Sequence, residues 1–257
     1  MNKQIDYRVT AVTLLVYVLI LSVCSNALAV AFEFPDILRE SAEYRLTLFM
    51  QNSGVIVPLY YFLALTGLIQ IVMAVMLYQS FGEKNSLAVM TAVFGILTGI
   101  FQVLGFIRWP IVVPYLADAM HSGVPMETIA FVEGMLNRYA GMAIGEHLGF
   151  LAQAVWTMLL GVMMLRHKLF DGRLGIIGLV LGGLTLLFGM EPLGGFWAPL
   201  GELTWPVLAA WIVWLVVLAI SLWRTNAKAP EGMHVGWKTA VVSTLFWAVA
   251  VVPAYLG

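Results

Sequence analysis

Long apolar segments alternate with short charged segments along this chain. A run of about 20 mostly apolar residues is long enough to cross the hydrocarbon core of a bilayer as a helix. The segments of this kind are 9–31, 54–79, 86–107, 139–165, 174–190, 199–223 and 239–256. The pattern predicts an all-α integral membrane protein, a bundle of seven transmembrane helices. The seventh segment ends in Val-Val-Pro-Ala-Tyr-Leu-Gly, so it could instead lie in the membrane interface.

The first segment also resembles a secretory signal peptide. Lys3 and Arg8 give it a basic start, residues 11–23 form an apolar core, and residues 27–29 (Ala-Leu-Ala) resemble a cleavage site. We interpret the segment as an anchor helix, with a cleaved signal peptide as the alternative.

Two segments between the apolar runs have an amphipathic pattern. Residues 35–50 mix charges with apolar side chains at positions that suit a helix lying in the interface plane. Residues 125–138 open with Pro125, a favoured first helical residue, and continue with apolar side chains at helical spacing. We expect two interfacial amphipathic helices on the same side of the membrane.

The distribution of charge predicts the orientation, because Lys and Arg are enriched in cytoplasmic loops. One side of the predicted membrane carries nine of the thirteen Lys and Arg: Lys3, Arg8, Lys84, Arg166, Lys168, Arg173, Arg224, Lys228 and Lys238. The other side carries ten of the fourteen Asp and Glu: Glu33, Asp36, Glu40, Glu43, Asp118, Glu127, Glu133, Glu146, Glu191 and Glu202. We expect the first side to be cytoplasmic, with the N-terminus inside and, after seven spans, the C-terminus outside.

The composition fits a single transmembrane domain over residues 1–257. Apolar residues make up 61% of the chain and charged residues 11%, whereas a soluble domain has about 25% charged residues. The net charge of −1 argues against a nucleic-acid partner. Cys24 is the single cysteine, which excludes a disulfide framework and a multi-cysteine metal site. We expect the lipid bilayer as a partner, and neither a metal nor a cofactor.

Glycines at a spacing of four predict close helix packing. Gly141, Gly145 and Gly149 follow this spacing in the fourth span, and Gly178 and Gly182 follow it in the fifth. Small residues at this spacing let two helix backbones approach each other in lipid. We expect simple helix packing here, and a binding cleft against the glycines is the alternative.

Ionisable side chains within a span are costly and are therefore candidates for function. Glu146 lies about 10 Å inside the fourth span at 1.5 Å per residue. Gln102 reaches a similar depth in the third span, and Arg108 stands at the outer end of that span. Since an unpaired buried carboxylate is unfavourable, we expect Arg108 to pair with Glu146 or with Glu191, at the outer end of the fifth span.

Two further residues complete the candidate ligand-binding set. Arg138 is a competing partner for Glu146, and His147 is turned about 100° away from Glu146 on a regular helix. Tyr139, Glu146 and Gln153 are seven residues apart and should share one face. We expect the set to line a polar cavity in the outer half of the bundle. The alternative is a structural role, in which an Arg–Glu pair fixes the helix register.

Three functions are compatible with this pattern. We favour a non-catalytic protein, either an accessory subunit of a larger membrane complex or a binder of a small or lipid-like molecule in the outer leaflet. A transporter is less favoured, because the inner halves of the spans are almost free of the ionisable groups that ion coupling would need. The third function is a membrane-embedded enzyme with Glu146 and His147 as acid and base, although adjacent helical residues point apart.

Five short motifs lie near the predicted outer ends of the spans. They are Phe34-Pro35-Asp36-Ile37-Leu38-Arg39, Arg108-Trp109-Pro110, Asn137-Arg138-Tyr139, Gly145-Glu146-His147-Leu148-Gly149 and Glu191-Pro192-Leu193-Gly194. In these motifs the chain resembles a bacterial family of polytopic membrane proteins known only as a domain of unknown function, over about residues 10–224. The resemblance implies a six-span core, to which 239–256 adds a further helix, and implies no activity, substrate or cofactor. Together with the charge pattern it predicts the bacterial cytoplasmic (inner) membrane as the location.

Overall fold

The structure is a computed structural model that describes residues 3–167 and 170–225, and every regular element in these ranges is helical. Six segments are long and apolar enough to cross a membrane: Tyr7–Phe32, Ala42–Phe81, Ser86–His121, Met126–Arg166, Gly172–Leu193 and Gly195–Arg224. They agree with the first six predicted spans. The predicted seventh span, residues 239–256, lies outside the described residues.

The described residues form eight α-helices, of which six form a closed ring in the order in which they follow one another along the chain. Their bounds are α1 Lys3–Phe32, α2 Ala42–Phe81, α3 Ser86–Phe106, α4 Arg108–His121, α5 Met126–Leu136, α6 Gly149–Arg166, α7 Gly172–Phe188 and α8 Thr204–Arg224. The ring runs α1, α2, α3, α6, α7, α8 and returns to α1. Four shorter elements connect them: η1 Asp36–Arg39, η2 Asn137–Leu148, η3 Glu191–Leu193 and η4 Gly195–Leu203.

The connections between the spans alternate between two ends of the ring. Residues 33–41 and 189–203 lie at one end together with α4 and α5, and the α2–α3 and α6–α7 connections lie at the other. We call these the acidic end and the basic end, after the charges that the sequence assigns to each. The acidic end as the outer side of the membrane stays a prediction.

Local side chains explain where several helices begin and end. Ser41, Asn85 and Asp171 precede α2, α3 and α7, and each accepts a hydrogen bond from a backbone N–H in the first turn. Such a cap contributes about 1 kcal/mol to helix stability. Helix α2 ends at Gly82, whose φ of 67° lies in the left-handed region that favours glycine.

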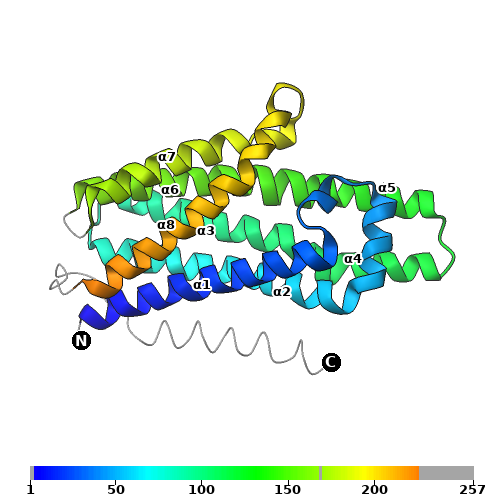
Figure 1. The fold of residues 1–257 in the computed structure, drawn as a ribbon, viewed down its shortest axis with the longest axis horizontal. Helices are drawn as coiled ribbons and strands as arrows, with labels where there is room; N and C mark the ends of the chain where they lie inside the picture. The colour runs from blue at the N-terminus through cyan, green and yellow to red at the C-terminus, as the bar shows by residue number, and fades with distance from the viewer. Residues whose placement is uncertain (1–2, 168–169, 226–257) are drawn as a thin grey trace.

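Three helical segments are much longer than a bilayer is thick, and two of them, 86–121 and 126–166, follow each other along the chain. Segments 86–121 and 126–166 contain 36 and 41 residues, which correspond to about 54 and 61 Å, against about 30 Å of hydrocarbon. The excess forms a hairpin of α4 and α5 at the acidic end (Figure 1). The break at Ile107 between α3 and α4 is explained by Pro110, which lacks the N–H that would continue the helix.

Most residues of the two segments predicted to be amphipathic helices are helical, as parts of longer helical segments, and their amphipathic role stays a prediction. Residues 42–51 form the first part of α2, before a non-helical residue at Asn52 (φ −126°, ψ 19°), and cross the direction of the ring helices (Figure 1). Helix α5 runs directly into η2 and α6. Their location in the membrane interface stays a prediction. We call η1, residues 42–51, α4 and α5 together the cap.

The described residues form two separate hydrophobic cores. The first lies within the ring and is built around Trp156, Trp211 and Trp214. The second joins the cap to the acidic end of the ring, and Tyr60 and Trp109 stack at its centre with 5.0 Å between their ring centroids. The cap therefore packs on the ring as a folded unit.

Glycines allow the closest helix contacts, as the four-residue spacing predicts. A Cβ atom on Gly145 would lie 2.9 Å from the Cα atom of Gly105, so η2 and α3 touch through their backbones. Gly178 and Gly182 make similar contacts with α6, where a Cβ on Gly182 would lie 2.8 Å from the carbonyl oxygen of Ala154. These contacts support the helix-packing interpretation of the glycines.

Candidate functional site

Arg39 binds two carboxylates at the acidic end. Its Nη2 atom lies 2.6 Å from Glu146 Oε2 and 2.5 Å from Glu191 Oε2, and its Nε atom donates to Glu191 Oε1 at 3.0 Å. The Arg39 side chain is 41% exposed, and the two Glu side chains are 17% and 20% exposed. Partial burial opposes the charge of Arg39, but the hydrogen bonds and charges of Glu146 and Glu191 outweigh it and raise the Arg39 pKa. We call these residues the Arg39 triad.

The expected pairing of Arg108 with Glu146 or Glu191 is wrong. Arg108 is buried and donates instead to the carbonyl oxygen of Gly105 and, at 3.0 Å, to Asn137 Oδ1. Asn137 in turn donates to the carbonyl oxygen of Leu38 at 3.2 Å. The Arg108 guanidinium also lies 5.2 Å from the centre of the Trp109 ring. Arg108 thus connects α3 to the cap.

The conformation of η2 explains part of this difference. Residues 137–148 form a π-helix, in which backbone hydrogen bonds join residues five apart instead of four. The expected common face of Tyr139, Glu146 and Gln153 assumed regular α-helical spacing. The wider turns change the angle between residues at that separation, and Glu146 points toward Arg39 rather than toward Arg108.

A buried ion pair in the cap was not anticipated from the sequence. Arg45 Nε donates to Glu133 Oε1 at 2.9 Å, a second bond joins Arg45 Nη2 to Glu133 Oε2, and Arg45 also donates to the Glu40 carbonyl. Both ion-pair side chains are buried. The available signal was spacing, because Ile129, Glu133 and Asn137 are four apart and all three are buried on one face.

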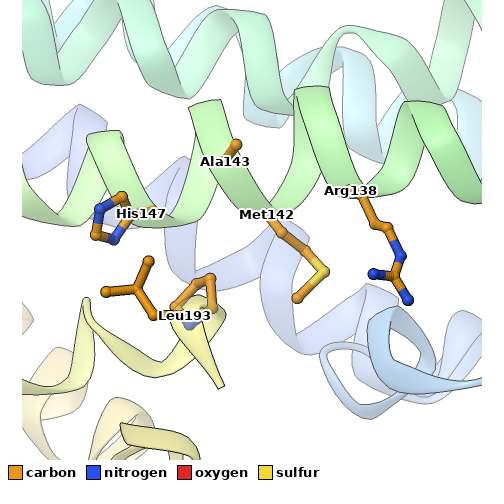
Figure 2. A pocket seen from close by; sticks show the side chains of 6 residues that line it. Arg138, Met142, Ala143, His147 and Leu193 are labelled. Carbon is orange, nitrogen blue, oxygen red and sulfur yellow. The ribbon is translucent and has the colours of Figure 1, made fainter. Parts of the chain in front are cut away.

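A shallow groove separates η2 from η3 (Figure 2). It has a volume of about 190 Å³ and is lined by Arg138, Met142, Ala143, His147, Pro192 and Leu193. Figure 2 shows Arg138 and His147 at its two ends, with Met142 between them. His147 Nδ1 lies 2.8 Å from the carbonyl oxygen of Gly189, which leaves Nε2 as the other hydrogen-bonding atom of the ring. We call this the η2–η3 groove.

The predicted ligand-binding set is therefore divided among four places. Glu146 and Glu191 belong to the Arg39 triad, and Arg138 and His147 line the η2–η3 groove. Arg108 is buried where α3 meets α4. Gln102 lies inside the ring, where it donates to Thr66 Oγ1 at 2.8 Å and accepts from the Tyr17 hydroxyl at 3.4 Å. Gln102, Arg108, Glu146 and Glu191 thus bond to different neighbours, and a single cavity lined by all four stays a prediction.

No three His, Cys, Asp or Glu side chains lie close enough to hold a metal ion within residues 3–167 and 170–225. The acidic end instead offers the Arg39 triad, in which one guanidinium binds two carboxylates, and the η2–η3 groove, which has one exposed guanidinium and one imidazole. Such groups can bind an anion or an amphipathic molecule.

A comparison with models of protein families shows to which family the chain belongs. A family model described as a domain of unknown function (DUF4386) matches residues 10–225. The chain belongs to the DUF4386 family. No curated protein and no solved structure matches it. The DUF4386 match covers the six-helix ring and the cap and ends at the last turn of α8, so the chain is a polytopic membrane protein of this family.

The five motif segments of this DUF4386 chain meet at the acidic end. Residues 34–39 contact 145–149 and 191–194 through the Arg39 triad. Residues 108–110 contact 137–139 through Arg108 and Asn137. The Asn137 bond to Leu38 joins the two groups. Segments that are far apart in the chain thus form one connected network beside the η2–η3 groove.

Proposed function

We propose that this DUF4386 protein is a non-catalytic membrane protein that binds an amphipathic, lipid-like molecule at its acidic end. The η2–η3 groove carries the proposal, because it combines cationic or hydrogen-bonding side chains with apolar ones. Arg138 and His147 provide the polar part, and Met142, Ala143, Pro192 and Leu193 provide the apolar part.

The headgroup of the proposed ligand is anionic. Arg138 is exposed and makes no hydrogen bond or ion pair with another residue that the structure describes. A free guanidinium matches a phosphate or carboxylate, to which it donates two parallel hydrogen bonds. Glu146 and Glu191, two carboxylates at the same end of the bundle, are bound to Arg39 and compete less for Arg138.

The size and depth of the groove favour a lipid-like molecule. At about 190 Å³ it is smaller than the 300–1,000 Å³ that is typical of sites enclosing a whole ligand. It can hold a headgroup while the rest of the molecule stays outside. Residue 146 is about 30 Å along the helix from Arg166, so the groove lies where the ring helices leave the hydrocarbon. Acyl chains could therefore remain in the bilayer, which is the outer leaflet if the acidic end faces outward.

The hydrogen bonds of Glu146 and His147, the possible acid and base, support the non-catalytic part of the proposal. The Glu146 carboxylate is salt-bridged to Arg39, and His147 Nδ1 is bonded to the Gly189 carbonyl. A general acid–base pair needs side chains that can exchange protons with a substrate. Glu146 and His147 face different partners, which favours binding over catalysis.

Calorimetric titration of the purified protein in detergent with a short-chain phosphatidylglycerol, below its critical micelle concentration, tests this function. Arg138→Gln should weaken binding about ten- to hundredfold, since a hydrogen bond to a charged group contributes about 1.5–3 kcal/mol. Arg138→Lys should retain part of the affinity, because the charge remains.

Arg173→Gln is the matched control, because Arg173 is also exposed but lies at the basic end. It should leave the dissociation constant unchanged. Equal affinity in the Arg138→Gln and Arg173→Gln variants would remove the basis of the proposal.

A further inference from the structure

A second polar feature lies inside the ring. Tyr17 of α1 donates to Gln102 of α3, which donates to Thr66 of α2. On the other side of Tyr17, its ring meets Trp211 of α8 edge to face at 6.2 Å, and Trp211 Nε1 donates to Thr157 Oγ1 of α6 at 3.0 Å. Polar side chains from five helices therefore meet in the interior of the bundle.

Three buried side chains near these contacts have unsatisfied polar atoms. Both amide atoms of Gln70, the Nε2 atom of Gln153 and the Nε1 atom of Trp156 have no hydrogen-bond partner among the described residues. Gln70 and Trp156 are 0% exposed, and Gln153 is 8% exposed. All three lie inside apolar spanning segments, well away from either end.

The faces of α2 and α6 that carry the unsatisfied atoms both contact Gly95 of α3. A Cβ on Gly95 of α3 would lie 2.6 Å from Trp156 Nε1 and 2.5 Å from the Cβ atom of Ala74, so the indole N–H reaches the α2–α3 contact. Gln70 lies one turn before Ala74 on α2, and Gln153 lies one turn before Trp156 on α6. Residues three and four apart share a helix face. Gln70 and Gln153 thus belong to the faces that meet at this contact.

Unsatisfied amide groups are strongly unfavourable in an apolar interior, and more so within a bilayer, where no solvent can pair with them. Buried polar groups of this kind are normally satisfied by bound water or a ligand. We propose that Gln70, Gln153 and Trp156 form an internal binding site for water or another small uncharged molecule that carries hydrogen-bonding oxygen atoms. This site is separate from the η2–η3 groove and does not depend on its function.

The chemistry of the surroundings defines the class of ligand. The three side chains of the proposed site offer amide and indole groups, and hydroxyl groups lie nearby on Tyr17, Thr66 and Thr157. A charged ligand would find no counter-charge among these groups. The nearby helices also pack closely, because a Cβ on Gly99 would lie 2.4 Å from the carbonyl oxygen of Gly67. The ligand must therefore be both uncharged and small.

X-ray radiolysis of the intact protein in detergent tests the site with water itself as the probe. Hydroxyl radicals form from water and oxidise the side chains beside it, even buried ones. Trp156 should be oxidised several-fold faster than Trp214, which is equally buried but has its Nε1 atom bonded to the Leu174 carbonyl. The double variant Gln70→Leu/Gln153→Leu should lose this difference. Oxidation of Trp156 as slow as that of Trp214 in the unaltered protein would overturn the proposal.

The change in thermal stability of Gln70→Leu is an independent test, because a bound ligand and an unpartnered amide predict changes of opposite sign. If Gln70 binds a ligand, Gln70→Leu removes those hydrogen bonds and lowers the midpoint of thermal unfolding. If its amide has no partner, the same change removes an unfavourable group and raises the midpoint, which would contradict the proposal. Met73→Leu, at a neighbouring buried position of α2, is the control and should have little effect. If Gln70→Leu does not fold, the comparison of Trp156 with Trp214 in the unaltered protein still decides.

Discussion

Replacing Glu133 with leucine should destabilise the cap more than any surface substitution. Arg45 and Glu133 are 5% and 3% exposed and share two hydrogen bonds. Removal of Glu133 would leave the Arg45 guanidinium buried, with the Glu40 carbonyl as its one remaining partner among the residues that the structure describes. Breaking one side of a buried ion pair costs about 3–5 kcal/mol, because the remaining charge is no longer compensated.

The expected change in melting temperature follows from the size of the chain. For 150–250 residues, each 1 kcal/mol shifts Tm by about 2–4 °C, so Glu133→Leu should lower Tm by about 6–20 °C. Arg45→Met should have an effect of similar size for the reciprocal reason. Thermal unfolding of the purified protein in detergent, followed by circular dichroism, measures both.

The double variant separates charge burial from packing. Arg45→Met/Glu133→Leu removes both charges and keeps apolar volume, so it should recover most of the lost stability. Glu127→Leu, an exposed position on the same helix, is the control and should change stability by less than about 1 kcal/mol. The reasoning fails if Glu133→Leu is as mild as Glu127→Leu, or if the effects of the two single changes simply add in the double variant.

Two further predictions follow from the helix contacts and from the predicted membrane topology. Gly145→Val should abolish folding or sharply lower the yield of folded protein, because its Cβ would meet the Gly105 backbone at 2.9 Å. Gly149→Ala should be tolerated, because the nearest neighbour of its Cβ would be 3.6 Å away. Size-exclusion profiles of the two variants check this, and a normal profile for Gly145→Val would contradict it. In a Cys24→Ser background, Glu202→Cys should react on intact cells with a membrane-impermeant maleimide and Lys84→Cys should not; the reverse pattern would show that the acidic end faces inward.

The spans could be predicted from the sequence because lipid contact depends on simple hydropathy. The third span was expected at 86–107 and α3 ends at Phe106, and the fourth was expected to end at residue 165 and α6 ends at Arg166. Each of these limits depends on where charged or helix-terminating residues interrupt an apolar run. Such signals are local, so they can be read without knowledge of the partner helices.

The choice of ion-pair partners could be predicted only in part. The sequence places Glu146 and Glu191 near each other at one end of the bundle, but their cation is Arg39, which is 107 residues from Glu146. Hydropathy gives no information on which distant segments meet. Arg45 was also missed, because an amphipathic interpretation of residues 35–50 assigns every charged side chain to the polar face.

The π-helical conformation of η2 has a consequence for how this segment can change. Residues 126–166 form one continuous rod, but its two ends follow different angular phases, because the wide turns of η2 shift every later side chain relative to a regular helix. The phase before η2 is set by Ile129 and Glu133 of α5 in the cap, and the phase after it by Gln153 and Trp156 of α6 in the ring. An insertion or deletion of a single residue within η2 would therefore rotate the ring against the cap, while substitutions on either side leave the phase of the other unchanged.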